Sequence, residues 1–369
     1  MMPERIKILF TTSNFQTAGS GKVIYDLVNG LNRDKFEIEI ACGHDRGQFF
    51  KTVEALGYPM HIVDTKTSYR PYLTLFSRTK IISKFFKRHN YDIVHSWQWS
   101  NDWTEALAAR LAGSKWIYTK KAMGFHNKHW KIKSFLAHFI ITINDDMKYY
   151  FPNKKNQKLI PLGIDTTYYS PLQFKGNPDS KLFKIITVAN LVPVKGIEVL
   201  INALNTLKND SVHLTILGAY DNEYGQYLKK LCKDLKMNHR IVFVGKKPDV
   251  RPYLAASNLY VIPTLDEGRK EGMPMALVEA MSMGIPVLGS NISGIKFVLQ
   301  SFPELLFEPG NPIKLREKIE MIRSSSLNDR KEIGEKLRHY CIENFELNQN
   351  IEAHQKLYFE LMNLQYPNA

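Results

Sequence analysis

The chain has 369 residues, about twice the size of an ordinary domain, so we expect two cores rather than one. Its composition of 44% hydrophobic, 12% aromatic and 23% charged residues excludes a largely disordered chain, a collagen-like fibre and a small disulfide scaffold. The three cysteines form no CxxC pattern, no apolar run is long enough to span a membrane, and the N-terminus lacks signal-peptide character, which together favour a cytoplasmic protein.

The net charge of +14 is uneven along the chain. Residues 1–170 contain 25 lysines and arginines against 14 acidic residues, whereas residues 171–369 contain 25 against 22. This asymmetry indicates either an anionic partner for the first half or simply a solvated, lysine-rich surface.

Short apolar runs alternate with helical periodicity along the first half, which is typical of an α/β fold with parallel sheets. The predicted strands are Ile6–Thr11, Phe36–Ala41, Met60–Val63, Asp92–His95 and Lys115–Thr119. A helix is expected over 23–31, and another with a basic face over Leu73–Phe86.

A second α/β series follows a segment rich in proline and poor in apolar residues, Ser170 to Lys181, which we interpret as an interdomain linker. Its predicted strands are Lys184–Ala189, His213–Leu217, Ile241–Val244, Leu259–Pro263 and Pro286–Gly289. Its predicted helices are Ile197–Leu207, Tyr224–Leu235, Val250–Ala256 and Pro274–Met283, followed by an amphipathic tail over Asn344–Leu364. The sequence therefore predicts two doubly wound domains in tandem.

The loop after the first strand contains Gly19, Ser20 and Gly21. It is not a P-loop, because Gln16 and Val23 stand where that motif needs glycine and serine or threonine. Its glycines fit a tight turn, and backbone amides at a helix start also suit a phosphate.

The second half contains two glutamates, Glu271 and Glu279, flanking a predicted helix start at Pro274. Amides from Gly272 to Met275, aided by the helix dipole, could hold an anion while a carboxylate on either side binds sugar hydroxyls. Considered alone, the two glutamates are better explained as a helix cap and an exposed helical residue.

This segment, with the Gly-Ile-Pro-Val that follows it, resembles the E-x7-E motif of GT4-type retaining glycosyltransferases, also called glycosyl transferases group 1. Further segments resemble other elements of that family in the same order: 92–95, 159–165, 188–196, 241–245 and 260–264. The resemblance covers nearly the whole chain. It implies the GT-B fold, an α/β fold with two Rossmann-like domains facing a central cleft. The first domain, residues 1–168 with a returning helix 345–369, would bind the acceptor. The second domain, residues 169–344, would bind the nucleotide sugar.

The resemblance also implies roles for individual residues. Glu279 corresponds to the residue that binds the donor ribose, Glu271 to one beside the reacting sugar, and Lys195 to a lysine that neutralises the diphosphate. Two departures concern the predicted catalytic and donor-binding positions: Asn190 replaces the usual arginine, and Lys121 replaces the usual histidine. The remaining predicted site residues are Gly19, Ser20, Gly21, Gly272, Met273, Pro274, Met275 and Ala276 for the donor, and His95 for catalysis.

The expected activity is therefore transfer of a sugar from a nucleotide diphosphate sugar, with a UDP-linked sugar as the favoured donor, to a glycan or lipid-linked acceptor in cell-surface polysaccharide biosynthesis, with no cofactor and no metal. Arg269 and Lys270 are candidates to replace the missing arginine, and His126 is a second candidate active-site histidine.

Two basic, apolar runs indicate either peripheral membrane binding or ordinary core packing. They comprise Arg78, Lys80, Lys84, Lys87 and Arg88, and Lys120, Lys121, Lys128, Lys131 and Lys133. A UDP-sugar epimerase of the same fold and a nucleic-acid-binding protein stay open as alternatives, although no nucleic-acid-binding motif is present.

Overall fold

The computed structural model describes residues 5–16, 18–124, 127–174, 182–207, 209–268 and 271–366. The chain forms two compact units, which we call the N-terminal unit (Met1–Gly163 with Leu347–Ala369) and the C-terminal unit (Ile164–Glu346). The domain boundaries expected from the sequence, after residue 168 and before residue 345, fall a few residues from these transitions.

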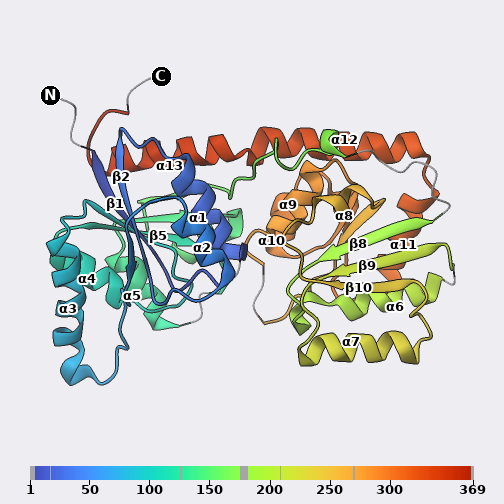
Figure 1. The fold of residues 1–369 in the computed structure, drawn as a ribbon, viewed down its shortest axis with the longest axis horizontal. Coiled ribbons are helices and arrows are strands. Elements are labelled where there is room, and N and C mark those ends of the chain that lie inside the picture. Colours follow the sequence, from blue (N-terminus) through green and yellow to red (C-terminus); the bar gives the residue numbers. More distant parts are fainter. Residues whose placement is uncertain are drawn as a thin grey trace. The chain divides into compact units, whose positions relative to one another are not determined.

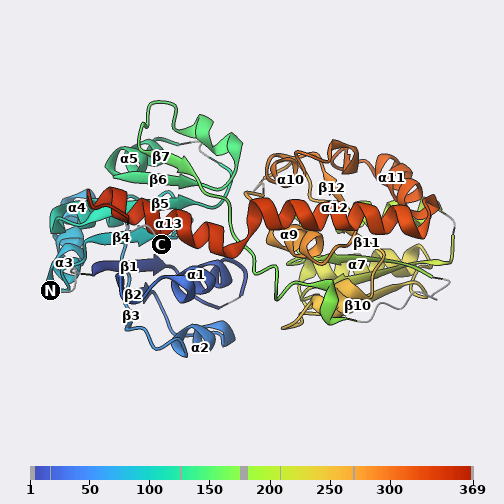
Figure 2. The ribbon, with the colours of Figure 1, turned by 90° about the horizontal axis from the view of Figure 1, so that it is seen from above.

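The N-terminal unit contains a parallel sheet in the order β3-β2-β1-β4-β5-β6-β7 (Figure 2). Its strands are β1 (Ile6–Thr12), β2 (Phe36–Cys42), β3 (Met60–Ile62), β4 (Ile93–Ser96), β5 (Lys115–Lys120), β6 (Phe139–Thr142) and β7 (Gln157–Leu159). The central strands read as continuous apolar runs because helices cover both faces of a parallel sheet.

Six α-helices accompany this sheet in the described part of the N-terminal unit (Figure 1). They are α1 (Ala18–Gly30), α2 (Gln48–Glu54), α3 (Leu75–Arg88), α4 (Thr104–Ala112), α5 (Lys128–Leu136) and α13 (Leu347–Leu361). Phe86 of α3 and the stacked rings of Trp116 and Tyr118 in β5 belong to one buried cluster. The helix α13 lies across the middle strands, where the buried Tyr358 contacts Phe10 of β1 (Figure 2).

The C-terminal unit has a six-stranded parallel sheet in the order β10-β9-β8-β11-β12-β13. Its strands are β8 (Phe183–Val188), β9 (Val212–Leu217), β10 (Ile241–Gly245), β11 (Leu259–Ile262), β12 (Val287–Ser290) and β13 (Leu306–Phe307). Its α-helices are α6 (Ile197–Leu207), α7 (Glu223–Asp234), α8 (Arg251–Ala255), α9 (Met275–Ser282), α10 (Ser293–Val298), α11 (Pro312–Ser324) and α12 (Leu327–Phe345). In each sheet the strand order reverses next to the first strand of the unit, between β1 and β4 and between β8 and β11. Doubly wound Rossmann-like domains have this reversal. The predicted fold class is therefore confirmed.

The structure adds elements that the sequence pattern did not predict. Strands β6 and β7 are not among the predicted strands, and β6 lies within the apolar stretch 135–143. This stretch contains His138, whose Nδ1 accepts a hydrogen bond from the backbone N–H of Trp116 at 2.8 Å. Burial lowers the pKa of His138 to about 4. The imidazole is therefore neutral at physiological pH, which suits its position just before an apolar strand.

The predicted tail helix, Asn344–Leu364, corresponds mainly to α13, and its first two residues belong to the end of a separate helix, α12. Helix α12 begins with a capping box between Ser326 and Asp329 and ends at Glu346, whose backbone is extended. Glu346 forms an isolated parallel bridge with Ile164, and its carboxylate accepts a hydrogen bond from the hydroxyl of Thr166. This local pairing interrupts the helix before α13 begins, which the amphipathic periodicity of the tail could not reveal.

Candidate functional site

The candidate site in the C-terminal unit is formed by the segments that follow β8 and β11. These neighbouring strands are where the order of the sheet reverses, and ligands of such folds bind beyond the carboxyl ends of the strands at this point. The loop after β8 carries Lys195, and the loop after β11 leads to Glu271 and α9. Residues separated by 76 positions in the sequence are thereby brought together.

Lys195 is positioned by a 3-10 turn, η4 (Pro193–Lys195). The backbone N–H of Leu265, in the loop after β11, donates to the carbonyl of Val194 at 2.8 Å, which attaches this turn to the neighbouring loop. Gly196 follows with φ of +61°, and a Cβ atom there would lie 2.2 Å from the carbonyl oxygen of Pro263. Glycine is therefore required both for the left-handed backbone and for the close approach.

Lys195 and Glu271 form an ion pair in which Nζ donates to Oε1. Their side chains retain 22% and 18% of their exposure, so a ligand can reach both groups. The backbone carbonyls of Glu271 and Gly272 pack against Gly294 of α10, where a Cβ atom would lie 2.5 Å from each of these oxygens. The segment carrying Glu271 is thus held in place by backbone packing on one side and by Lys195 on the other.

Glu279 lies on the half-buried side of α9, about one turn into the helix. The hydroxyl of Tyr169 donates to its Oε1 at 3.1 Å. Beneath α9, the phenol of Tyr260 in β11 is fully buried, and burial together with the nearby Glu279 and Glu271 carboxylates holds its pKa well above the usual range. The two glutamate carboxylates of the predicted motif therefore lie near the same buried phenol, that of Tyr260.

Arg338 of α12 supports this arrangement from the other end of α9. Its guanidinium donates to the carbonyls of Ser282, Tyr169 and Thr166. Ser282 also donates to the carbonyl of Tyr169 at 2.7 Å. Sequence reasoning overlooked Tyr169 and Arg338, because neither belongs to the motif and their partners are far away in the chain.

The other predicted donor-binding residues of this unit surround the start of α9. Pro274 is the N-cap, so the helix starts one residue later than expected, at Met275. The first N–H groups of a helix have no intrahelical acceptor. The amides of Met275 and Ala276, the first two residues of α9, are therefore open to a ligand at this end of the helix. Gly272 and Met273 are buried in the preceding turn. Asn190 is exposed after β8, and its expected role stays a prediction.

Gly19, Ser20 and Gly21 lie in the first turn of α1, at the carboxyl end of β1. This is the equivalent position in the N-terminal sheet, where the strand order also reverses. Lys121 follows β5 at the same edge of that sheet, with its Nζ 5.8 Å from the ring centroid of Trp97. The roles of these four residues stay predictions. His126, Arg269 and Lys270 lie outside the described residues.

The structure does not support a catalytic role for His95. The imidazole is fully buried in β4, with Nδ1 2.8 Å from the hydroxyl of Tyr358 and Nε2 2.8 Å from the hydroxyl of Thr119. Burial, followed by the proximity of His354 and Lys121, holds the pKa of His95 well below its usual value. With both nitrogens engaged and no exposed surface, His95 links α13 to the sheet rather than contacting a substrate.

The second basic run does not form one surface. Lys120 is buried and donates to the carbonyls of Ala122 and Gly124 at 2.5 and 2.9 Å. Lys133 is also buried and donates to the carbonyl of Ser100 at 2.8 Å, and burial lowers its pKa to about 8. These two lysines stabilise the N-terminal unit internally, so the interpretation of the whole run as a membrane-facing patch is wrong.

Profiles of two protein families match this chain in succession. "Glycosyltransferase Family 4" matches residues 17–168, and "Glycosyl transferases group 1" matches residues 170–345. Together with the two Rossmann-like units, these matches define a protein of the GT-B class. The chain belongs to the GT4-type glycosyltransferases and is therefore an enzyme that transfers a sugar.

Similar proteins include two bacterial glycosyltransferases. A capsular polysaccharide biosynthesis glycosyltransferase of Staphylococcus aureus is 25% identical over 82% of this chain and 86% of its own length. A UDP-Gal:α-D-GlcNAc-diphosphoundecaprenol α-1,3-galactosyltransferase of Escherichia coli is 30% identical over 57% of this chain and 60% of its own length.

Solved structures share the fold over almost the full chain. A glycosyltransferase of Rickettsia africae has a TM-score of 0.85 at 19% identity, covering 98% of this chain and 100% of that one. HepE of Anabaena in complex with UDP and glucose has a TM-score of 0.79 at 17% identity, covering 96% and 99%. Within the described residues, no helix combines the length and the apolarity needed to cross a membrane.

Proposed function

We propose that this enzyme transfers a sugar from a UDP-linked donor, with retention at the anomeric carbon, to a glycan or lipid-linked acceptor in cell-surface polysaccharide biosynthesis. The observation that carries the proposal is that Lys195 and Glu271 form an ion pair just before α9, while Glu279 lies about one turn inside the same helix. This group combines a cation, the amides of a helix start and two carboxylates, which suits a diphosphate flanked by sugar hydroxyls.

The donor is expected to bind as follows. Glu279 accepts hydrogen bonds from the ribose hydroxyls, while Tyr169 keeps its carboxylate oriented. Lys195 and the amides at the start of α9 hold the diphosphate, and Glu271 lies beside the transferred sugar. Lys195 then leaves its ion pair with Glu271 for the phosphate oxygens, where negative charge develops during the reaction.

In the chemical step, the bond between the anomeric carbon and the phosphate oxygen breaks, and the acceptor oxygen bonds to the same face of the sugar. The acceptor proton passes to the departing phosphate oxygen, so the products are the glycosylated acceptor and UDP. Lys195 and the amides described above neutralise the leaving group, so we propose that transfer needs no metal. Proton NMR of the newly formed linkage tests retention directly.

The UDP assignment is supported by what the similar proteins are named for. HepE was solved with UDP and with UDP-glucose, and the E. coli relative is named as a UDP-Gal-dependent enzyme that acts on a diphosphoundecaprenol-linked sugar. The S. aureus relative is named for capsular polysaccharide biosynthesis, which supports the proposed biosynthetic role.

The donor is tested by thermal shift of the full chain with UDP-, GDP- and ADP-sugars, because at a given ligand concentration tighter binding raises apparent stability more. We expect only UDP-sugars to raise the melting temperature. Glu279→Gln should weaken UDP binding by about tenfold or more, since a hydrogen bond to a charged acceptor contributes about 1.5–3 kcal/mol. Glu335→Gln changes an exposed glutamate of the same unit and serves as the control. Equal affinity of the Glu279→Gln variant and the wild type would overturn the assigned role.

Assays with the same protein and the same UDP-sugars distinguish two alternative functions from sugar transfer. An epimerase of this fold would consume a UDP-sugar without an acceptor and release a different UDP-sugar, whereas a transferase releases UDP. A nucleic-acid-binding protein would show salt-sensitive DNA binding without UDP-sugar affinity.

We infer that α3 places the enzyme at an anionic membrane on its cytoplasmic side. Its buried face, including Ile82 and Phe86, packs inside the N-terminal unit. The opposite face exposes Lys80, Lys84, Lys87 and Arg88. The same helix and the turn before it expose large apolar side chains: Tyr72 at 59%, Leu73 at 99%, Phe76 at 63% and Ile81 at 69%. A basic helix with exposed apolar residues suits a bilayer interface.

Replacing Lys80, Lys84, Lys87 and Arg88 together with glutamine should reduce partitioning onto vesicles containing phosphatidylglycerol by at least about tenfold, because each such charge contributes about 1 kcal/mol near an anionic surface. Co-sedimentation measures the effect. Glutamine at Lys230, Lys233, Lys236 and Lys331 of the C-terminal unit removes the same number of exposed charges as a control. Vesicle binding that is independent of anionic lipid, or an equal loss in the control, would contradict this role of α3.

A further inference from the structure

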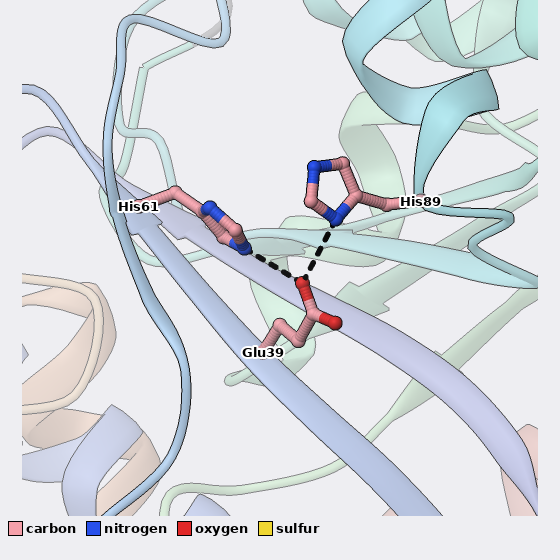
Figure 3. Close-up of side chains that lie close together, drawn as sticks. All are labelled: Glu39, His61 and His89. Atoms are coloured by element: carbon pink, nitrogen blue, oxygen red, sulfur yellow. Dashed lines mark hydrogen bonds and ion pairs between the residues drawn. The ribbon is translucent and has the colours of Figure 1, made fainter.

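Three side chains distant in sequence meet on one face of the N-terminal sheet, and the proposed sugar transfer uses none of them (Figure 3). Glu39 comes from β2, His61 from the adjacent β3, and His89 is the residue that follows α3. One donor atom from each lies within 4.8 Å of the others. Two imidazoles and one carboxylate form a donor set that transition metals prefer, whereas Mg²⁺ and Ca²⁺ prefer oxygen donors alone.

The two distances between the carboxylate and the imidazoles are close to those of a metal site. Oε2 of Glu39 is 2.7 Å from Nε2 of His61 and 3.6 Å from Nδ1 of His89. In tetrahedral zinc coordination with bonds of about 2.0–2.1 Å, neighbouring ligand atoms lie about 3.3 Å apart. The two observed distances bracket this value, so small side-chain movements would accommodate an ion. In Figure 3 both imidazoles direct a nitrogen toward the same carboxylate oxygen.

The carboxylate is held by the kind of outer contacts that metal ligands have. Lys7 donates to Oε1, the oxygen that faces away from the two imidazoles, at 2.9 Å. The hydroxyl of Tyr91 donates to Oε2 at 2.5 Å. Such second-shell hydrogen bonds fix the orientation of a ligating group. The ring of His89 is itself stacked on Tyr91, with an interplanar angle of 4°.

Charge and access also suit a cation. Lys7 is shared between two carboxylates, Glu37 and Glu39, so the buried centre of the group carries an excess of negative charge when the imidazoles are neutral. Arg5 reaches only the outer carboxylate, Glu37, at 3.4 Å, and its side chain is 50% exposed. The side chains of His61 and His89 retain 23% and 28% of their exposure, which gives an ion a route from solvent, whereas that of Glu39 retains 8%.

We propose that Glu39, His61 and His89 form a binding site for a divalent transition-metal ion, with zinc as the ion that fits best. The ion would join β2, β3 and the C-terminal end of α3. Its expected effect is to stabilise the N-terminal unit and to hold the end of the exposed basic helix. This site is separate from the C-terminal residues assigned to sugar transfer, and the proposal does not depend on that assignment.

The test uses the full chain after removal of metals by chelation and dialysis. Isothermal titration should show one Zn²⁺ ion bound per chain. Co²⁺ should give the visible absorption of a four-coordinate site with the three side chains and one water as ligands, and Mg²⁺ should have no effect. Zinc should also raise the melting temperature. His61→Ala and His89→Ala should each lower zinc affinity by about 100-fold, and Tyr91→Phe, which removes an outer hydrogen bond, by about tenfold.

His339→Ala is the matched control, because His339 also pairs with a single carboxylate, Glu343, at 3.0 Å, but on the surface of α12. It should leave the high-affinity site unchanged. Circular dichroism of each metal-free variant separates loss of binding from loss of folding. Equal zinc affinity of the wild type and a folded His61→Ala/His89→Ala double variant would overturn the proposal, as would the absence of zinc binding by the wild type.

Discussion

Replacing Lys195 with alanine is expected to lower kcat for sugar transfer by about 100- to 1000-fold, the loss typical of removing one group that stabilises developing negative charge. Lys195 is held at the end of η4 and already contacts a carboxylate next to the helix start where the diphosphate should bind. Without this cation, the departing UDP has less stabilisation. A coupled assay of UDP release with a suitable acceptor measures the effect.

The Lys195→Arg variant should retain part of the activity, because the positive charge remains while its geometry changes. Glu271→Gln should also lower kcat, and it tests the other member of the pair. Lys314→Ala is the control, since Lys314 forms a similar pair with Glu317 at 2.9 Å on an exposed helix of the same unit. Activity of Lys195→Ala within tenfold of the wild type, in a protein that melts normally, would show that the diphosphate is neutralised elsewhere.

Gly196→Ala is expected to remove most activity through the backbone alone, by about 100-fold, together with a loss of about 1–3 kcal/mol in stability from overpacking. The added Cβ would lie 2.2 Å from the carbonyl oxygen of Pro263, so the turn bearing Lys195 must move away from the end of β11. Lys195 would then no longer reach the start of α9. UDP affinity and kcat should therefore fall together.

Gly113→Ala provides a close comparison for this substitution. Gly113 also has a left-handed backbone, with φ of +88°, but a Cβ atom there would meet nothing within 4 Å. The Gly113→Ala variant should lose stability because of the strained backbone, while its sugar-transfer activity should stay unchanged. If both variants lose the same activity, backbone strain and not the contact with Pro263 explains the result at Gly196.

Much of the fold followed from local patterns. The strand Ile6–Thr12 and the helix Ile197–Leu207 were predicted nearly to the residue, because apolar spacing directly reflects which side of an element is buried. Strands β6 and β7 were not predicted, since the first has only four residues and follows His138, and the second is short and polar. The break at Glu346 depends on a pairing with Ile164, a residue far away in the chain.

In the candidate site, too, some residues were predictable from the local sequence and others depend on contacts between distant residues. The E-x7-E segment and Lys195 were predicted through the resemblance to the glycosyltransferase family, because each belongs to a short motif that is contiguous in the sequence. Tyr169 and Arg338, which orient Glu279 and hold α9, gave no such signal. The expectation for His95 failed for the same reason: a histidine at a strand end looks alike whether it faces a ligand or, as here, Tyr358 of a returning helix.

The sequence by itself determined that this protein has two parallel α/β units and the order of the motifs between them, because burial periodicity and turn chemistry are local properties. Only the tertiary structure decided which distant side chains are neighbours. It buried Lys120 and Lys133, so part of the positive charge in the first half is internal, and it left the basic face of α3 exposed. It also brought Glu39, His61 and His89 together, because strand order and helix packing, not sequence spacing, determine which side chains meet.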